Sequence, residues 1–551
     1  MDMDLGEWKG AVERRIERWA QTGFLSDLWD RNPALWSDHP VEEISDRLGW
    51  LDLPGRLPET AARLRNFARE VGEEGIDRVL LLGMGGSSLA PEMAARIFGP
   101  APGCPGLSVL DSTHPDAVAA LTEDLDPRRL LVVVSSKSGT TLETMSLMEY
   151  FWNWVGSAAG DPGERFCAVT DPGSPLSELA VSKGFRRVFH APSDVGGRFS
   201  ALSVFGLLPA VLLGVDLDEW GRRAAAEIES NRPYSPVSES RALALGAALG
   251  ELAAFMDKLT IRVSSRMEGF PDWIEQLVAE SLGKQGKGWL PVIDEPEAGA
   301  GKCGRDRFFV TMSLREEAEN GMPLFRRRAA AAGFPVLGFE LEQPECIAAA
   351  MVRWEIAVAA AGSIMGVHPF NQPDVQLSKS LAREAMAAPE APGENDSDAL
   401  VTGSSRLRDG LSAWLDSFRP GDYVGIQAFL APFPATREAL RRIRKTLRGG
   451  EGRAVTMGFG PRFLHSTGQY HKGGPGNGLF LQLIDEPRRD LAVPGRGYTF
   501  GRLIRAQAQG DYRALRESGR RVVRVNLGGD VAAGLAELHE ILSERSGSRG
   551  G

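Results

Sequence analysis

Two short polar loops hold the side chains and backbone groups best suited to chemistry. The first is GMGGSS (83–88), which joins an apolar stretch to a helical pattern. Glycines let the backbone approach an anion closely, and the amino terminus of a helix offers free N–H groups. Asp111, at the end of the next apolar stretch, keeps a dinucleotide site open, because such sites place an acid about twenty residues further on. Ser88 replaces the third glycine of that pattern, so this loop alone fits a nucleotide or a simple phosphate.

The second loop, SSKSGTT (135–141), favours a phosphate over a nicotinamide cofactor. It crowds hydroxyl groups and the ammonium group of Lys137 at another turn from strand to helix. A terminal phosphate dianion needs such donors, because hydroxyls and N–H groups satisfy its oxygens with help from a positive charge. Capping of the following helix is the ordinary alternative, but a cap needs only one Ser or Thr. The second loop therefore predicts a phosphate site.

Apolar stretches alternate with helical patterns around both loops, and this predicts an α/β fold. Such alternation indicates parallel, doubly wound sheets that bind ligands at the carboxyl ends of their strands. We expect two doubly wound parallel-sheet domains and a third, C-terminal α/β domain. The predicted boundaries are an N-terminal helical segment at 1–75, the first domain at 76–219, the second at 220–385, a linker at 386–399 and the C-terminal domain at 400–551.

The bulk composition is that of an ordinary globular protein. The chain has 551 residues, of which 43% are apolar and 25% charged, and its net charge of -10 argues against a nucleic-acid or anionic-membrane surface. Its four cysteines form no CxxC pair, which disfavours a disulfide scaffold or a zinc site. The most apolar run (201–215) is too short to span a bilayer, and the acidic amino terminus differs from a signal peptide. We expect a cytoplasmic protein with no metal, nucleic acid or membrane partner.

Several segments resemble, in order, the motifs of a known family. GMGGSS and SSKSGTTLET resemble the two phosphate loops of the sugar isomerase (SIS) domain. DVGGRFSALSVFGLLPA is similar to the GGR-(F/Y)-S signature of the glucose-6-phosphate isomerase family, WIEQLVAESLGKQGKG to its ESxGK segment, and HPFNQPDVQLSK to its (N/D)QxGVxxxK segment. These matches run from about residue 79 to 385, so both doubly wound domains are expected to be of the SIS type.

The C-terminal part carries a narrower resemblance. GPRFLHSTGQYHKGGP and YTFGRLIRAQAQGDYRAL resemble the isomerase half of fused transaldolase–glucose-6-phosphate isomerase proteins. No transaldolase portion precedes these segments in this sequence, and we expect the chain to begin where that half would.

The resemblance implies an aldose–ketose isomerase of glycolysis and gluconeogenesis that interconverts glucose 6-phosphate and fructose 6-phosphate through an enediol(ate), without a cofactor. It implies that the substrate phosphate is held by Gly86, Ser87, Ser136, Lys137, Ser138 and Thr141. Glu280 would be the base that moves a proton between C1 and C2. Glu280 ends a helical run just before Gly283, where the helix dipole should raise its pKa. Without the resemblance, a solvated carboxylate at a helix end would be the ordinary interpretation.

Arg198, Gln372 and Lys379 complete the implied site around the sugar. Arg198 follows two glycines, and its guanidinium could stabilise the negative oxygen of an enediolate. A structural arginine that pairs with an acid such as Asp194 is the alternative. Gln372 and Lys379 lie seven residues apart, so one face of a helix can present both if a helix spans them. The resemblance places both at the sugar, with Lys379 assisting ring opening.

The histidines depart from the family pattern. The family usually carries a ring-opening histidine between the glutamate and the QxGVxxxK segment, often from the partner subunit, whereas the only histidine between Glu280 and Gln372 is His368. His465 and His471 are the other candidates. A lone histidine is usually structural, but two in the glycine-rich HSTGQYHKGG favour a loop that faces a ligand. We therefore expect the C-terminal domain to contribute to the active site.

Several alternatives stay open on the sequence alone. One is a phosphosugar isomerase of broader specificity that also accepts mannose 6-phosphate, and another is a non-catalytic sugar-phosphate-binding SIS protein. A binding protein needs the phosphate loops but no base. Four residues therefore speak against it: Glu280, Arg198, Gln372 and Lys379. A nicotinamide enzyme is a third alternative. A small-molecule sugar phosphate is the expected partner, and a homodimer is possible.

Overall fold

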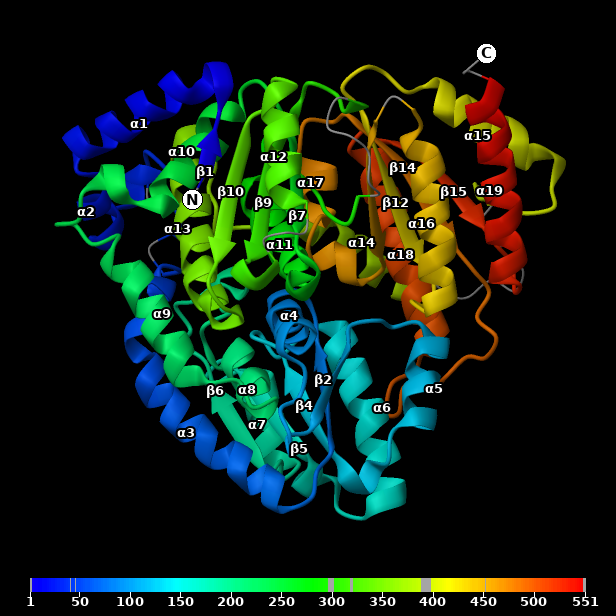
Figure 1. Cartoon of the computed structure of the whole chain (residues 1–551). Helices are drawn as coiled ribbons and strands as arrows, with labels where there is room; N and C mark the ends of the chain where they lie inside the picture. The colour runs from blue at the N-terminus through cyan, green and yellow to red at the C-terminus, as the bar shows by residue number, and fades with distance from the viewer. Residues whose placement is uncertain are drawn as a thin grey trace.

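The computed structural model describes residues 2–39, 41–44, 46–295, 302–317, 321–387, 398–450 and 452–548. Within these residues the chain forms three five-stranded sheets flanked by helices (Figure 1). Most strands are apolar stretches buried on both faces, as expected for parallel sheets covered by helices. The predicted α/β fold is therefore confirmed. In Figure 1 the first sheet lies below the other two.

The first sheet is entirely parallel and has the order β3-β2-β4-β5-β6. Its strands are β2 (Arg78–Gly83), β3 (Gly106–Leu110), β4 (Leu130–Ser135), β5 (Phe166–Thr170) and β6 (Arg187–His190). Its helices are α4 (Leu89–Phe98), α5 (Pro115–Asp124), α6 (Leu142–Ala159) and α7 (Pro175–Ser182). The strand order reverses between β2 and β4, where Gly83 lies opposite Ser135. The two polar loops therefore leave adjacent strands at the place where such sheets bind ligands.

The second sheet has the order β1-β10-β9-β7-β8, in which only β1 is antiparallel. Its strands are β1 (Asp2–Asp4), β7 (Lys258–Val263), β8 (Leu290–Val292), β9 (Arg307–Leu314) and β10 (Val336–Leu341). Between the first and third sheets the chain also forms α8 (Val204–Leu212), α9 (Leu217–Glu229), α10 (Arg241–Leu252), α11 (Phe270–Leu282), α12 (Met322–Ala331), α13 (Ile347–Met365) and α14 (Pro373–Ala387). Of these, α8 packs against α4 beside the first sheet. We did not expect β1, because three residues are too few to give a strand periodicity.

One helix among the described residues, Pro344–Met365, is long and apolar enough by composition to cross a membrane. Its most apolar window is 83% buried inside the molecule, where α13 packs against α10 and α9. A long apolar helix buried in this way is also typical of the centre of a globular core.

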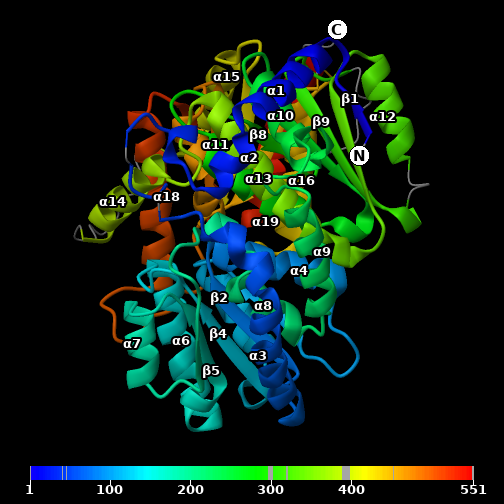
Figure 2. The same ribbon diagram turned by 90° about the vertical axis from the view of Figure 1, so that its left-hand side faces the viewer.

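The amino-terminal segment contains α1 (Lys9–Thr22), α2 (Phe24–Trp29) and α3 (Leu53–Glu73). Trp19, Trp36 and Trp50 are buried in one core cluster with apolar side chains of the first and second sheets. In Figures 1 and 2, α3 runs along the first sheet, and the ring of Phe67 contacts that of Phe189 at the end of β6. The helices thus bury their apolar faces against the larger units.

The third sheet is entirely parallel and has the order β11-β15-β14-β12-β13. Its strands are β11 (Leu400–Val401), β12 (Tyr423–Phe429), β13 (Ala454–Phe459), β14 (Gly478–Ile484) and β15 (Arg521–Asn526). The helices α15 (Ser405–Asp416), α16 (Pro434–Arg448) and α19 (Val531–Ser548) share one core cluster with it. The short α17 (Gly468–Gly473) and α18 (Phe500–Glu517) contribute to a second cluster that also holds Ala279 of α11.

The third sheet is joined closely to the rest of the chain. α14 packs along α18, as Figure 2 shows, and α17 contacts both α11 and α14. Most of the predicted linker at 386–399 lies outside the described residues.

Candidate active site

The first polar loop is a tight turn, η4 (Gly85–Ser87), packed against the backbone that carries Arg198. A Cβ atom built on Gly86 would lie only 2.0 Å from the carbonyl oxygen of Gly197. Gly85 has a φ of +57°, in the left-handed region that favours glycine. Glycine at both positions therefore allows Ser87 and Arg198 to be carried by turns in direct contact.

The hydroxyl groups of the second loop bond to one another rather than to the helix that follows. The Oγ of Ser136 lies 3.1 Å from the Oγ1 of Thr141 and accepts the N–H of Gly139 at 3.2 Å. The hydroxyls of Ser138 and Thr140 lie 2.9 Å apart. Thr141 is the N-cap residue of α6 but makes no side-chain cap bond. The first turn of α6 therefore has no side-chain cap, which argues against ordinary capping.

Lys137 lies on this loop with part of its hydrogen-bonding capacity unused. Its ammonium group forms an ion pair with Asp171 and donates to the carbonyl oxygen of Ser193 at 3.0 Å. An ammonium group has three donors, so one remains for a ligand. Burial raises the pKa of Asp171, although the charge of Lys137 opposes this effect.

Glu280 is buried in the last turn of α11, with its side chain against Arg198. The Oε2 of Glu280 accepts the side-chain amide of Gln276 at 3.2 Å and lies 3.8 Å from the Nε of Arg198. Arg198 thus faces Glu280 and not Asp194. α11 ends at Leu282, and its C-cap residue Gly283 donates to the carbonyl oxygen of Ala279.

The guanidinium group of Arg198 is fixed by neutral acceptors. It donates to the Oγ of Ser281 and to the carbonyl oxygens of three consecutive residues, Pro369, Phe370 and Asn371. The N–O distances of these bonds are 2.7–3.1 Å. Burial lowers the pKa of Arg198. Because the carbonyls bring no full charge, Glu280 is the counter-ion nearest to this guanidinium among the described residues. The positive charge remains available to an anionic oxygen.

Gln372 immediately follows the three carbonyls that Arg198 binds, and α14 begins one residue later, at Pro373. Lys379 lies on α14, but its side chain is outside the described part of the structure. The backbone thus brings Gln372 to the site, and the helix that carries Lys379 starts there.

Lys284 is a buried cation that the sequence patterns did not single out. Its Nζ donates to the carbonyl oxygen of His368 at 2.5 Å. Burial, reinforced by the charge of Arg198, lowers the pKa of Lys284 well below its usual range. The ESxGK motif contains this residue, but nothing in its spacing reveals that it is buried beside Arg198.

His465 reaches the first sheet from the turn η13 (Arg462–His465) that follows β13. Its Nε2 lies 3.1 Å from the Oε1 of Glu143, in the first turn of α6. Its carbonyl oxygen accepts the side-chain amide of Gln276 at 2.8 Å. A Cβ built on Gly85 would lie 3.1 Å from the Cβ of His465. His465 therefore contacts the first polar loop, the helix that follows the second, and the glutamine that binds Glu280.

Glu143 is held by a second donor besides His465. The side-chain amide of Gln507 on α18 donates to the same Oε1 at 2.8 Å, and Thr113 donates its hydroxyl to Gln507 at 2.7 Å. The carboxylate is therefore oriented toward the imidazole of His465. No sequence pattern pointed to Glu143 or Gln507, because their partners are hundreds of residues away.

His471 and His368 are buried away from the polar loops, and the Nε2 of His471 has no hydrogen-bond partner among the described residues. His471 is buried against the aromatic rings of Phe463 and Phe480, and Gln427 lies 3.2 Å from its Nδ1. Burial lowers the pKa of His471 well below its usual range. His368 accepts the N–H of Phe370 on Nδ1 and lies 3.1 Å from a backbone oxygen on Nε2, and burial lowers its pKa to about 4. Of these three histidines, His465 is the one that lies against the polar loops.

The loop after His465 is anchored to α11, the helix that carries Glu280. The side chain of Gln469 donates to the carbonyl oxygen of Gly283 at 3.1 Å and accepts the N–H of Asp374 at 3.0 Å. The hydroxyl of Ser466 donates to Glu275 on α11 at 3.2 Å, and burial raises the pKa of Glu275 to about 8. These contacts bind the third sheet to both ends of the Glu280–Gln372 region.

Arg462 joins all three parts of the chain through carboxylates. It pairs with Glu92 of α4, with Asp111 at 2.8 Å and with Asp272 of α11 at 3.5 Å. Asp111 is the residue that kept a dinucleotide site open, and its carboxylate is engaged by this arginine. Among the residues that the structure describes, no group of three or more His, Cys, Asp or Glu side chains is arranged to hold a metal ion.

Comparisons with known proteins identify the family. The sequence model "Phosphoglucose isomerase" matches residues 59–289. A glucose-6-phosphate isomerase of Thermus thermophilus is 30% identical over 395 residues, which cover 63% of this chain and 92% of the relative. One from Rubrobacter xylanophilus is 28% identical and covered over 94% of its length. This chain belongs to the glucose-6-phosphate isomerase family.

Other matches extend over different shares of each partner. A glucose-6-phosphate isomerase from a second strain of Thermus thermophilus is 36% identical over 248 residues, or 44% of this chain and 57% of that relative. A solved structure of a hypothetical protein from Thermus thermophilus superposes with a TM-score of 0.60 and 26% identity, over 70% of this chain and all of the other. That of a glucose-6-phosphate isomerase from Chlamydia trachomatis gives a TM-score of 0.56 at 18% identity, over 73% and 88% of the two chains, and so supports the fold alone.

The match to the phosphoglucose isomerase model includes the two polar loops, Arg198 and Glu280, and it ends at residue 289. Gln372, Lys379 and His465 therefore lie outside this match. The family match thus covers the two polar loops and the Glu280–Arg198 pair, whereas the contacts that the third sheet makes with them lie outside it.

Proposed function

We propose that the chain is a glucose-6-phosphate isomerase that interconverts glucose 6-phosphate and fructose 6-phosphate through an enediol(ate). The observation that carries this proposal is the buried Glu280 carboxylate, which faces the Arg198 guanidinium beside two hydroxyl-rich loops. A base, a fixed positive charge and a phosphate site are the parts that aldose–ketose isomerisation requires.

The two polar loops would hold the substrate phosphate at the carboxyl ends of β2 and β4. The contributing groups are the backbone of Gly86, the ammonium of Lys137 and the hydroxyls of Ser87, Ser136, Ser138 and Thr141. The amino terminus of α6, which has no side-chain cap, adds N–H groups and a positive dipole end. This placement fixes the other end of the sugar relative to Glu280.

Glu280 removes the proton from C2 of the open-chain aldose and returns it to C1, while the hydroxyl proton of O2 passes to O1, so that C1 becomes an alcohol and C2 a ketone. The reverse reaction uses the same group. Arg198 stabilises the enediolate oxygen because its charge is fixed by neutral carbonyls and needs no reorganisation. Gln276 orients the carboxylate through its amide, and Gln372 lies where it can hydrogen-bond a sugar hydroxyl. The sum of the oxidation states of C1 and C2 does not change, so the reaction needs no redox cofactor.

Ring opening is assigned to His465, with Lys379 on α14 as the assisting group. An imidazole can give a proton to the ring oxygen, and the Glu143 carboxylate keeps the His465 ring oriented. His471 is assigned a structural role, because a buried neutral imidazole among aromatic rings cannot reach a substrate at the polar loops.

Four finer assignments belong to the same proposal. We propose three domains with the boundaries predicted from the sequence, a likeness to the isomerase half of fused transaldolase–isomerase proteins, a cytoplasmic location and assembly as a homodimer. Broader specificity that includes mannose 6-phosphate is the second candidate, because the described contacts do not distinguish the C2 configuration. Comparison of turnover on the two aldose phosphates separates these candidates.

The deciding experiment replaces Glu280 by Gln and measures isomerisation of fructose 6-phosphate in a coupled assay. Turnover should fall by the roughly 10²–10⁴-fold that general base catalysis supplies. Binding of a phosphosugar inhibitor should stay within about twofold, because the phosphate contacts are untouched.

Glu275→Gln is the matched control, since Glu275 lies on the same helix and is bound by Ser466 instead of facing Arg198. It should keep most of the activity. If Glu280→Gln retained about a tenth of wild-type turnover, Glu280 would not be the base, since a tenfold loss is smaller than the usual contribution of a general base.

A further inference from the structure

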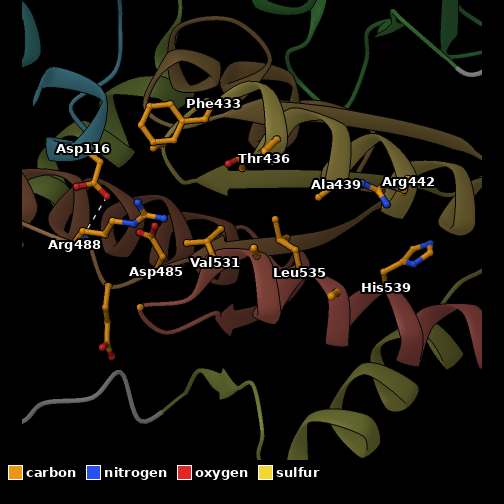
Figure 3. A pocket seen from close by; sticks show the side chains of 16 residues that line it. Asp116, Phe433, Thr436, Ala439, Arg442, Asp485, Arg488, Val531, Leu535 and His539 are labelled. Carbon is orange, nitrogen blue, oxygen red and sulfur yellow. Dashed lines mark hydrogen bonds between the residues drawn. The ribbon is translucent and has the colours of Figure 1, made fainter. Parts of the chain in front are cut away.

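A groove lies on the third sheet, formed by α16 and α19 on the face that does not pack against α11. Its volume is about 410 Å³, within the range of sites that hold small molecules. Figure 3 shows it lined from above by Phe433, Thr436 and Ala439 and from below by Val531 and Leu535. Nothing in the isomerase mechanism uses these residues.

The groove occupies the position where a parallel α/β sheet binds ligands. The third sheet repeats the strand order of the first, since β13-β12-β14-β15 corresponds to β3-β2-β4-β5. The strand order reverses between β2 and β4 in the first sheet and between β12 and β14 in the third. The groove opens at the loops after β12 and β14, and in the first sheet the corresponding loops are the polar loops of the candidate active site.

One end of the groove is suited to an anion. α16 has Phe433 as its N-cap residue and so lacks a side-chain cap, whereas Asp530 binds the N–H of Ala533 at the start of α19. The N–H groups of Ala435 and Thr436 belong to this uncapped turn. Arg488 also lines the groove, and within the described residues no carboxylate pairs with its guanidinium. An uncapped first turn together with an unpaired guanidinium favours a phosphate group.

The middle of the groove is lined by apolar side chains. Phe433 is 38% exposed, and the small side chains of Ala435, Ala439, Ala532 and Ala536 line the walls beside Val531 and Leu535. Four alanines leave a slot between the helices rather than a broad surface. A flat ring fills such a slot and removes its apolar surface from water.

The carboxylates at the same end are mostly engaged within the protein. Asp485 lies 3.0 Å from the Nε2 of His114, and Asp116 accepts the backbone N–H of Arg488 at 3.3 Å. Glu486 is exposed at the groove and has no ion-pair partner among the described residues, so it can accept hydroxyl groups of a ligand.

We propose that this groove binds an organic phosphate with a flat apolar ring, which is the chemistry of a nucleoside monophosphate. The phosphate lies at the first turn of α16 with Arg488, the ring lies between the alanines, and Glu486 accepts ribose hydroxyls. A hexose phosphate has no apolar ring, so the ligand of this groove differs from the substrate.

The test is calorimetric titration of the full chain with AMP, with adenosine and inorganic phosphate as separate arms. AMP should bind saturably in the presence of saturating fructose 6-phosphate. Adenosine and inorganic phosphate should each bind at least about tenfold more weakly than AMP, because each makes only part of the contacts. Gly529→Leu should abolish AMP binding, because Gly529 lines the groove and the new side chain would occupy it. The chain should tolerate the substitution, because the φ of Gly529 lies outside the left-handed region and a Cβ there meets no atom within 4 Å.

Arg488→Gln should weaken AMP binding about tenfold by removing a charge-assisted contact. Arg489→Gln is the matched control, because Arg489 pairs with Glu123 outside the groove. All three variants should retain isomerase activity. The proposal is overturned if AMP fails to bind, if fructose 6-phosphate displaces it, or if Gly529→Leu leaves its affinity unchanged. It is also overturned if Gly529→Leu changes the sedimentation of the chain instead, which would make this face a contact between copies.

Discussion

His465 and His471 provide a matched pair of variants that tests the role of the third sheet in catalysis. We expect His465→Asn to lower turnover of cyclic glucose 6-phosphate by roughly 10²–10⁴-fold, the usual contribution of a positioned acid–base group. The fold should be preserved, because Glu143 keeps its bond from Gln507 and is not left without a partner. Glu280 and Arg198 are untouched, so solvent exchange at C2 of an open-chain analogue should continue near the wild-type rate.

His471→Asn should have the opposite profile. His471 is 4% exposed among aromatic rings, so the smaller side chain loses packing and costs about 1–3 kcal/mol of stability. Its turnover on the cyclic sugar, measured below the unfolding transition, should match the wild type. If both variants isomerise the cyclic sugar normally, His465 is structural and Lys379 must open the ring. If His465→Asn also loses exchange at C2, the histidine acts on the base and not on the ring.

Three further perturbations address the phosphate loops and the buried acid of α11. Lys137→Ala removes a charge-assisted contact worth roughly 1.5–3 kcal/mol, so KM should rise about tenfold or more, and an unchanged KM would place the phosphate elsewhere. Gly86→Ala puts a Cβ 2.0 Å from the carbonyl oxygen of Gly197 and so displaces the turn that carries Arg198. The fall in kcat, expressed as a free energy, should exceed the change in the free energy of unfolding. Burial raises the pKa of Glu275 from 4.5 to about 8, so between those pH values the unfolded chain releases a proton that the folded chain keeps, and stability falls as pH rises. At about 1.4 kcal/mol per pH unit, and with partial contact with solvent, Glu275→Gln should relieve about 2–5 kcal/mol at pH 8 and almost none at pH 4, measured by urea unfolding; an equal effect at both pH values would contradict this assignment.

Local patterns in the sequence were enough to predict the α/β fold and the position of the polar loops. An apolar strand, a glycine turn and a helix are consecutive in the chain, so the order of residues alone places GMGGSS and SSKSGTT at strand ends. Glu280 was likewise placed near a helix end because Gly283 follows it. These inferences depend on residues only a few positions apart.

The remaining features depend on partners that are distant in the chain. Glu143 and Gln507 are 364 positions apart, and no local pattern connects them. The same holds for Arg198, whose carbonyl acceptors are 171–173 positions away in the loop that follows α13. The sequence could not separate His465 from His471, because both stand in one glycine-rich segment and only packing turns one toward Glu143 and the other toward Phe480. β1 was missed because a three-residue strand is defined by its pairing with β10.

The position of His465 in the chain affects when the enzyme becomes active during its synthesis. The polar loops and Glu280 precede His465, which follows Glu280 by 185 positions, the difference between 465 and 280. At roughly 5–20 residues per second, a ribosome adds that stretch in about 10–40 s. Over this interval the nascent chain contains the groups proposed to bind phosphate and the proposed base, but not the imidazole assigned to ring opening. A chain still attached to the ribosome would therefore leave the cyclic hexose phosphates around it unchanged until its third sheet has been made.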